Sequence, residues 1–207
     1  MRITLLVATK NQKKLREIKQ IMRDMPCKII SLADINKPIY IREDGQTFKE
    51  NAIKKATTVA AKTGMLTMGE DSGLCVDALG GAPGVRSARY SGRNKSDEKN
   101  NQKLLQQLKD VPEKKRRAYY VCAIALADKN GLIGVVEGRC YGRIAKEPRG
   151  KNGFGYDPLF LIRRFGKTFG ELPISVKHKI SHRFKALKKV KQLLEKYIEK
   201  ENKHCYN

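Results

Sequence analysis

The chain has 207 residues, 40% of them hydrophobic, which excludes a disordered protein and suffices for the core of one α/β domain. No apolar run approaches the roughly 18 residues of a membrane span, and no signal-peptide cleavage site follows the apolar start. The five cysteines are scattered and never in a CxxC spacing, which argues against disulfides and zinc and for reduced thiols in the cytoplasm.

The net charge of +23 arises from 44 Lys and Arg against 21 Asp and Glu. Such a field attracts polyanions, whether nucleotides or nucleic acid. The lysines are spread along the chain, however, and many fall where solvated charges of helices belong. A basic nucleic-acid-binding protein is the alternative class, but we expect no specific nucleic-acid binding, because no RRM, KH or zinc-finger pattern is present.

The first part of the chain alternates predicted strands and helices. Residues 2–8 predict a buried strand, and apolar residues at helical spacing predict a helix that follows to about Arg23, with Asn11 as its N-cap. Residues 27–32 predict a second strand.

A capping box and a glycine delimit the next predicted helix. Thr47-Phe48-Lys49-Glu50 indicates the start of an alanine-rich helix that ends at Gly64. A short strand over residues 65–69 is then predicted to break at Glu70-Asp71-Ser72-Gly73, and extended structure is predicted to resume over 74–76.

Later segments predict a helix, a hairpin, a glycine-rich loop and a final helix. The helix begins at Ser96, and the hairpin spans residues 119–144 around Asn130-Gly131. The glycine-rich loop spans residues 150–158, and the final helix spans residues 181–200. Together the elements predict an α/β fold with a mixed, twisted central sheet flanked by helices. No internal repeat is present, so residues 1–207 are predicted to form a single domain.

A first candidate cluster joins the first predicted strand to the first predicted helix. It reads Thr9-Lys10-Asn11-Gln12-Lys13-Lys14. Backbone amides and the partial positive charge at a helix N-terminus suit phosphate, and hydroxyl, amide and ammonium side chains add donors. The motif lacks the glycine spacing of a Walker loop, so an ordinary N-cap with surface lysines is the competing interpretation.

A second cluster consists of acids, which are scarce in this chain. Glu43-Asp44-Gly45 and Glu70-Asp71-Ser72-Gly73 both resemble turns, where solvated acids are common. Magnesium, however, is usually held by one or two carboxylates together with substrate phosphates and water. One acid from each group, brought together by the fold, would meet that requirement.

A third cluster combines an aromatic loop with cations. Glycines flank Phe154 in Gly153-Phe154-Gly155-Tyr156-Asp157-Pro158, so the loop is able to present a ring for stacking on a base, or else to plug the core. Lys177 follows, and His182 and Arg183 stand at a predicted helix start, where cations are normally unfavourable. An anionic or electron-rich ligand would relieve that mismatch.

Taken together, these clusters resemble the inosine triphosphate pyrophosphatase family, also called dITP/XTP or non-standard purine nucleoside triphosphate pyrophosphatases. The resemblance runs from about Ile3 to Leu193. Its motifs are Ala8-Thr9-Lys10-Asn11, Thr47-Phe48-Lys49-Glu50-Asn51-Ala52, Asp71-Ser72-Gly73-Leu74, Val76 to Gly84, Ser87-Ala88-Arg89-Tyr90, Gly153 to Pro158, and Ile180-Ser181-His182-Arg183.

The resemblance implies hydrolysis of ITP, dITP or XTP to the monophosphate and pyrophosphate with Mg²⁺, by a homodimer whose two lobes surround an active-site cleft. It implies that Glu43 and Asp71 ligate Mg²⁺ and that Asp71 accepts the proton of the attacking water. The implied triphosphate contacts are Thr9, Lys10, Asn11, Gln12, Lys13, Lys14 and Lys55, and Ser72 also contacts substrate. The implied base pocket consists of Phe154, Gly155, Tyr156, Asp157, Lys177, His182 and Arg183.

The chain departs from the family pattern at three positions. Lys10 replaces a usual glycine and Lys13 a frequent one, which changes the backbone path open to the phosphate loop. Glu70 stands where Asp is common and lengthens that carboxylate. A related pyrophosphatase that acts on modified pyrimidine nucleotides is a second alternative, and a panel of substrates would distinguish the two.

Overall fold

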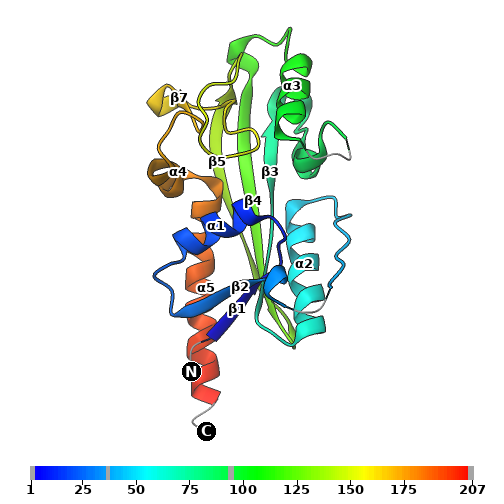
Figure 1. The fold of residues 1–207 in the computed structure, drawn as a ribbon, viewed down its shortest axis with the longest axis vertical. Coiled ribbons are helices and arrows are strands. Elements are labelled where there is room, and N and C mark those ends of the chain that lie inside the picture. Colours follow the sequence, from blue (N-terminus) through cyan, green and yellow to red (C-terminus); the bar gives the residue numbers. More distant parts are fainter. Residues whose placement is uncertain (1–2, 36–37, 93–95, 205–207) are drawn as a thin grey trace. The chain divides into compact units, whose positions relative to one another are not determined.

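The structure of the chain is a computed structural model that describes residues 3–35, 38–92 and 96–204. Its strands are β1 (Ile3–Val7), β2 (Cys27–Ser31), β3 (Thr67–Val76), β4 (Arg117–Asp128), β5 (Gly131–Ile144), β6 (Phe160–Ile162) and β7 (Lys167–Thr168). Its helices are α1 (Gln12–Ile21), α2 (Phe48–Thr63), α3 (Asp97–Gln107), α4 (Ile174–Ile180) and α5 (His182–His204) (Figure 1).

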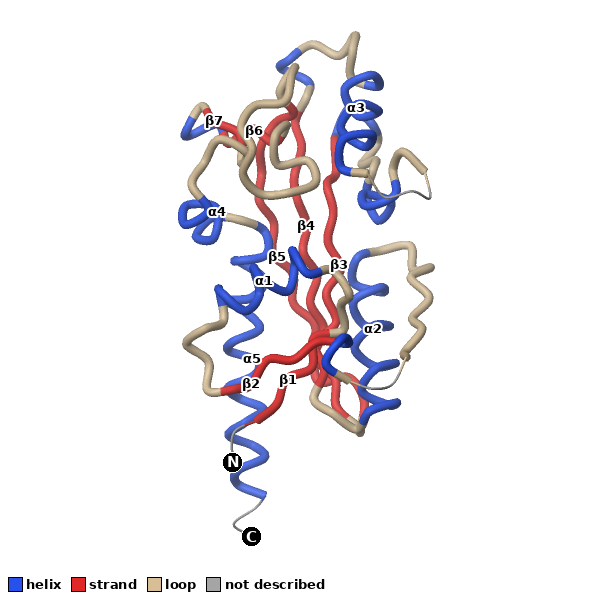
Figure 2. The backbone as a smooth tube through the Cα atoms, in the orientation of Figure 1, coloured by secondary structure: helices blue, strands red, loops and turns tan. Residues whose placement is uncertain are grey.

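The described strands form one open sheet in the order β2-β1-β3-β4-β5-β6-β7 (Figure 2). Strand β1 pairs in parallel with both β2 and β3, whereas β6 pairs antiparallel with β5 and β7. Only two residues connect β4 to β5, and a connection this short joins antiparallel neighbours. The predicted mixed sheet with flanking helices and the predicted hairpin are both confirmed.

The chain divides into two compact units. The first comprises Met1–Asp71, Cys122–Gly138 and Arg183–Asn207, and the second comprises Ser72–Val121 and Arg139–His182. Strands β3, β4 and β5 each begin in one unit and continue into the other. Each unit has a hydrophobic core of its own.

In the first unit, the side chains of β1 alternate between the two faces of the sheet, as the period of a strand requires. Leu5 and Val7 pack in a cluster with apolar residues of α1 and α5. Leu6 and the following Ala8 pack with Val59 of α2. Helices α1 and α5 therefore cover one face of this part of the sheet and α2 covers the other (Figure 1).

In the second unit, α3 packs on the sheet through Leu104 and Leu108, which are fully buried against Leu74 and Val76 of β3. An aromatic group extends this core: the ring centroids of Tyr120 and Phe160 lie 4.6 Å apart. Apolar packing against β3 therefore fixes the position of α3 within the second unit.

The helix-end signals of the sequence are mostly confirmed. The Asn11 side chain caps α1 by accepting hydrogen bonds from the amides of Lys13 and Lys14. Thr47 caps α2, and Gly64 ends it in the left-handed conformation at φ 69°. The capping box is incomplete, because the Glu50 carboxylate accepts from the amide of Gln46, at 2.8 Å, and no bond to the Thr47 amide is seen among the described contacts.

The predicted break at Glu70-Asp71-Ser72-Gly73 is wrong. Strand β3 runs without interruption from Thr67 to Val76, and Glu70 and Asp71 are buried within it. Acids usually mark turns because their charge prefers water. Here cationic side chains from other elements compensate both carboxylates, so the strand continues through them.

Three short elements have no counterpart among the predictions. They are α4, β6 and β7, with seven, three and two residues. Periodicity of apolar residues is read over windows of about 11 residues for a helix and at least four for a strand, and these segments are shorter than that.

Helix α2 lies unusually close to β3 at Gly69. A Cβ at this position would lie 2.2 Å from the carbonyl oxygen of Ala52 and 2.6 Å from the amide nitrogen of Ala56. Only glycine permits such an approach. The contact presents one face of α2 to the two acids that follow Gly69.

No helix among the described residues has the length and apolar character needed to cross a membrane. Four of the five cysteines, Cys27, Cys75, Cys122 and Cys140, are buried, and none of them forms a disulfide within the part of the chain that the structure describes. Cys205 lies outside the described residues.

Replacing Gly69 by Ala is expected to lower the free energy of unfolding by about 3 kcal/mol, because the new methyl group meets rigid helix backbone. Gly64→Ala is the control, because the space around Gly64 is open. This variant is expected to lose roughly 1 kcal/mol of unfolding free energy, since alanine is strained in the left-handed conformation. Urea denaturation measures both. A Gly69→Ala protein at least as stable as Gly64→Ala would contradict the close approach.

Candidate active site

The centre of the candidate site is a pair of acids in β3, Glu70 and Asp71, which are 2% and 7% exposed. Strands β1 and β3 are parallel neighbours, with Val7 opposite Met68. The residues after Val7 and the residues after Met68 therefore continue in the same direction, side by side. The Thr9–Lys14 segment is thereby brought beside the two acids. Burying charged carboxylates is unfavourable unless cations or hydrogen bonds compensate them.

Helix α2 supplies one such cation and one amide. The Lys55 ammonium lies 3.1 Å from Asp71 Oδ1 and donates to the Glu70 carbonyl oxygen, also at 3.1 Å. Asn51, one turn earlier, donates to Asp71 Oδ2 at 3.1 Å and accepts from the Gly45 amide at 2.8 Å. Asn51 was assigned no role from sequence, although its i, i+4 spacing from Lys55 placed both on one helix face.

Lys55 also joins the two predicted metal ligands. Its ammonium lies 2.8 Å from Glu43 Oε2 and 3.1 Å from Asp71 Oδ1. Burial alone would lower the pKa of Lys55, but attraction to Asp71 and Glu43 outweighs it, so that pKa is raised and the group stays charged. The carboxylates of Glu43 and Asp71, far apart in the chain, therefore converge on one cationic position.

The environment of Asp71 shifts its affinity for protons. Burial raises the pKa of this carboxyl above its usual value, and the neighbouring Glu70 adds to the rise, while Lys55 and Lys14 oppose it. A carboxylate with a raised pKa is a stronger proton acceptor. Asp71 thus combines burial, two nearby cations and enhanced basicity.

The Thr9–Lys14 segment is organised around Asn11. The Lys14 ammonium lies 3.0 Å from Glu70 Oε2, while Lys10, Gln12 and Lys13 are exposed. The Asn11 side chain occupies the amides of Lys13 and Lys14, and Thr9 Oγ1 accepts from the Asn11 amide at 3.1 Å. These three amides are therefore not free, so a phosphate would meet mainly the side chains of this segment.

Arg183 resolves the mismatch of cations at the start of α5. Its guanidinium is buried, donates to Glu70 Oε1 at 3.2 Å, and forms an ion pair with Glu17 of α1. Burial would lower the pKa of Arg183, but Glu70 and Glu17 raise it well above its usual value. The protein's own carboxylates thus compensate this cation, where the sequence suggested a ligand.

In the second unit, Asp157 organises the glycine-rich loop. Its Oδ2 lies 2.6 Å from the Lys177 ammonium and accepts from the Phe154 amide at 2.9 Å. The same ammonium lies 4.9 Å from the centre of the Phe154 ring. Gly153 has φ 78° and a Cβ there would lie 2.0 Å from Asp157 Oδ2, so the loop requires this glycine.

The remaining predicted pocket residues are held by the protein. The Tyr156 hydroxyl donates to the Ser87 carbonyl at 2.8 Å, and its side chain is buried. His182 stacks on Tyr120, with centroids 4.5 Å apart and planes 11° from parallel. Ser72 follows Asp71 directly in β3 and is partly buried.

The donor set fits a magnesium ion completed by substrate. Among the residues that the structure describes, no group of three or more His, Cys, Asp or Glu side chains is arranged to hold a metal ion. Glu43 and Asp71, however, already share one cation between them. Mg²⁺ takes one or two carboxylates and fills its other positions with phosphate oxygens and water, so these two residues suit it.

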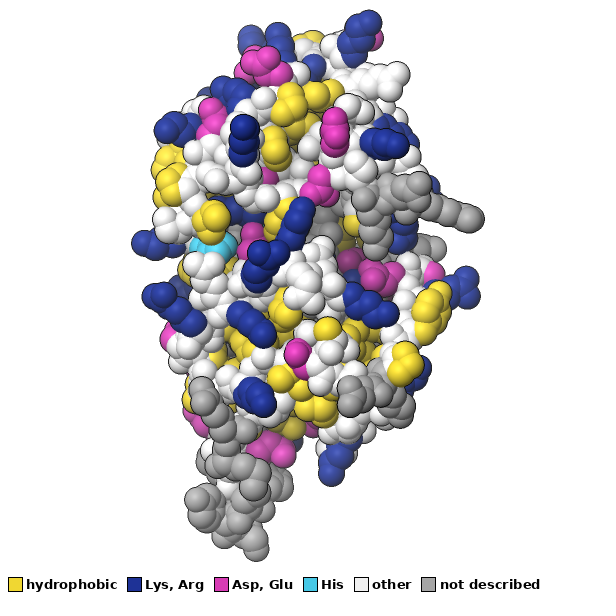
Figure 3. All heavy atoms as spheres, in the orientation of Figure 1, with side chains coloured by type: hydrophobic (Ala, Val, Ile, Leu, Met, Phe, Trp, Pro, Cys, Tyr) yellow, Lys and Arg dark blue, Asp and Glu magenta, His cyan; other side chains and the backbone are white. Residues whose placement is uncertain are grey.

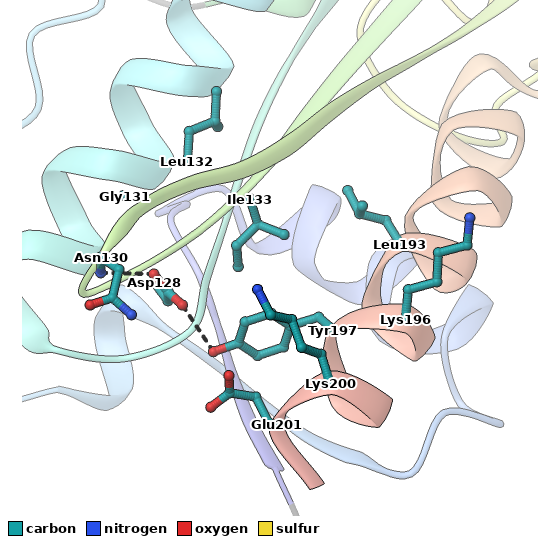
Figure 4. Close-up of a pocket in the computed structure, with 10 residues that line it drawn as sticks. All are labelled: Asp128, Asn130, Gly131, Leu132, Ile133, Leu193, Lys196, Tyr197, Lys200 and Glu201. Atoms are coloured by element: carbon teal, nitrogen blue, oxygen red, sulfur yellow. Dashed lines mark hydrogen bonds between the residues drawn. The ribbon is translucent and has the colours of Figure 1, made fainter. Parts of the chain in front are cut away.

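Two further surface features of the described residues give no indication of a second ligand site. A hollow of about 410 Å³ lies in the first unit between the β4–β5 hairpin and α5, where the Tyr197 hydroxyl hydrogen-bonds Asp128 (Figure 4). Its lining includes Lys196 and Lys200 but also Asp128 and Glu201, so its charges favour no class of ligand. On the face shown in Figure 3, Lys and Arg side chains are scattered and not gathered into one patch.

Buried lysines beside carboxylates within a strand of a mixed α/β sheet are able to bind phosphate through the lysines and a divalent cation through the carboxylates. The family model described as "Ham1 family" matches residues 5–193. With nearly the whole chain matched, the protein belongs to the Ham1 family.

Individual relatives agree with this family. The dITP/XTP pyrophosphatase of Geobacter sulfurreducens is 49% identical over 190 residues, 92% of this chain and 96% of the relative. That of Bacillus subtilis is 45% identical over 190 residues, with the same coverage. The solved structure of a HAM1 protein from Coxiella burnetii is 40% identical and superimposes with a TM-score of 0.85, covering 94% of this chain and 99% of that one.

Lys55→Met is expected to raise the pKa of Asp71 further, because it removes the nearest of the cations that lower it. Lys54→Met is the matched control, since the neighbouring Lys54 is exposed and pairs with Asp44. Carbon-13 NMR titration of the Asp71 carboxyl measures the effect. An unchanged or lower pKa in Lys55→Met would show that this ion pair does not set the basicity of Asp71.

Proposed function

We propose that this protein hydrolyses the non-standard purine nucleoside triphosphates dITP, XTP and ITP to the monophosphate and pyrophosphate, and so cleanses the nucleotide pool. The observation that carries the proposal is the convergence of Glu43 and Asp71 on the Lys55 ammonium, with Lys14 paired to the adjacent Glu70. The names of relatives up to 49% identical over most of the chain support the substrate class.

In this proposal Asp71 is the proton acceptor. Water attacks the α-phosphorus, the bond to the bridging oxygen of the β-phosphate breaks, and the proton of the water passes to Asp71. The raised pKa of Asp71 suits it for this role, and lowering the pH through that pKa removes activity because the protonated carboxyl accepts no proton. Asn51 donates a hydrogen bond to Asp71 Oδ2 and so fixes the orientation of the Asp71 carboxylate.

Glu43 and Asp71 would hold Mg²⁺, which supplies charge neutralisation on phosphate oxygens when it is bound. Lys14 and Lys55 would supplement it by binding the triphosphate, together with Thr9, Lys10, Asn11, Gln12 and Lys13. Ser72 would contact the substrate next to Asp71. Lys55 is buried and Lys14 partly buried, so their charges are screened less by water than those of the exposed lysines.

Recognition of the base is assigned to the loop around Phe154, Gly155, Tyr156 and Asp157, with Lys177, His182 and Arg183. The 6-oxo group of hypoxanthine or xanthine accepts hydrogen bonds, which Lys177 and His182 donate, whereas adenine offers an amino donor. Arg183 pairs with Glu17 through Nη1 and with Glu70 through Nη2, so these carboxylates fix the orientation in which its guanidinium would meet a base. The ring of Phe154 would stack on the base.

Residues 1–207 are proposed to act as one catalytic domain, since the family match spans segments of both compact units. A homodimer in the cytoplasm is part of the same proposal, and it follows the resemblance of the motifs.

Asp71→Asn is expected to lower kcat by about 10²–10⁴-fold with a smaller effect on substrate binding, since it removes the proton acceptor but keeps the shape. Asp44→Asn is the control, because Asp44 is an exposed acid that pairs with Arg42 and Lys54. Pyrophosphate release under steady-state conditions measures both. Near wild-type turnover in Asp71→Asn would remove this residue from the mechanism.

ITP, XTP and dITP are expected to be hydrolysed with kcat/KM about 10²–10⁴-fold above that for ATP, because adenine leaves buried donors facing a donor. The assay is pyrophosphate release with Mg²⁺, with EDTA abolishing activity. Modified pyrimidine triphosphates belong in the same panel. Comparable values for ATP and ITP would overturn the base assignment, and preference for a pyrimidine would favour the related pyrophosphatase.

A further inference from the structure

The Phe154–Gly155 segment is held by α3 as well as by Asp157. The Gly155 amide donates to Asp97 Oδ2 at 2.9 Å, and the Gly155 carbonyl accepts from Asn101 Nδ2 at 3.0 Å. Asp97 and Asn101 stand one turn apart on α3, at the i, i+4 spacing that puts side chains on one face. Neither residue was a candidate from the sequence.

These contacts fix the backbone on both sides of Phe154. Before it, the Phe154 amide donates to Asp157 Oδ2, and after it the Phe154 carbonyl accepts from the Asp157 amide at 3.3 Å. The peptide group that contains this carbonyl also contains the Gly155 amide, which Asp97 holds. With the peptide groups on both sides fixed, the direction of the Phe154 Cα–Cβ bond, from which the ring extends, is fixed as well.

The support for this arrangement is rigid. Leu104, which follows Asn101 by three residues on α3, and the C-cap residue Leu108 are fully buried in the core of the second unit. Asn101 is itself 9% exposed, and its amide nitrogen must face the Gly155 carbonyl to donate. Gly155 has φ 63°, a conformation that the loop would leave more readily without external hydrogen bonds.

We propose that Asp97 and Asn101 are positioning residues for base recognition: they hold the Gly155 peptide so that Phe154 is preorganised to stack on the purine. They act through the loop and touch no substrate themselves. The inference rests on the proposed function for the role of Phe154. Preorganised contacts bind more tightly because the loop loses less freedom when the ligand arrives.

A spectroscopic reporter tests the placement independently of activity. The chain contains no tryptophan, so Phe154→Trp places a single tryptophan at the position in question, which is excited selectively at wavelengths above the absorption of the eight tyrosines. In that background Asp97→Ala and Asn101→Ala are expected to shift the emission to longer wavelength and increase acrylamide quenching. Asp97→Asn keeps an oxygen acceptor and is expected to restore the parent signal. Glu98→Ala, which removes an exposed acid from the same turn, is the matched control.

With Phe154 intact, Asp97→Ala and Asn101→Ala are expected to raise KM for ITP about tenfold while kcat stays within about twofold, since stacking contributes to binding and not to the chemical step. Asp97→Asn and Glu98→Ala are expected to match the parent. Thermal unfolding of each variant shows whether the fold is kept. If Asn101→Ala unfolds, the comparison of Asp97→Ala with Asp97→Asn tests the proposal, because Asp97 is exposed.

An unchanged reporter in Asp97→Ala and Asn101→Ala would overturn the proposal, as would a shifted reporter with an unchanged KM. If the parent protein hydrolyses no nucleoside triphosphate, the proposed function fails, while the reporter still decides whether α3 holds the ring.

Discussion

Two adjacent carboxylates buried inside β3 are the constraint around which the first unit is built. Glu70 and Asp71 are tolerated there because Lys14, Lys55 and Arg183 bring positive charge from three different helices. Removing one member of a buried ion group leaves an uncompensated charge, which is far more unfavourable than losing a surface pair. Helices α1, α2 and α5 are therefore tied to β3 by electrostatics as well as by apolar packing.

The same charges prepare the site for its chemistry. Lys55 stays protonated because two carboxylates share it, and Asp71 becomes more basic because burial outweighs the cations beside it. When a triphosphate and a divalent cation bind, the lysine would pair with phosphate oxygens and the carboxylates would ligate the cation, in place of the present lysine–carboxylate ion pairs. A site that is already polarised in this way needs little rearrangement when charge develops in a reaction.

The second unit repeats this principle on a smaller scale. Asp157 and Lys177 are both 3% exposed at their side chains and pair at 2.6 Å, and this pair sets the loop on which Phe154 stands. Asp97 and Asn101 complete the support from α3. Both units thus use buried or partly buried carboxylates to fix cations and loops, which is notable in a chain with 21 acids against 44 basic residues.

Elements with strong local signals were predictable from the amino-acid sequence: Asn11, Thr47 and Gly64 mark helix ends, and Asn130-Gly131 marks the hairpin. Its motifs also predicted roles for Glu43, Asp71 and Lys55, and the structure brings the Lys55 ammonium to both carboxylates. Only the tertiary structure decided that β3 continues through Glu70 and Asp71, and that Arg183 pairs with Glu70 across 113 residues. Caps and turns depend on neighbours a few residues away, whereas compensation of a buried charge depends on partners that only the fold brings together.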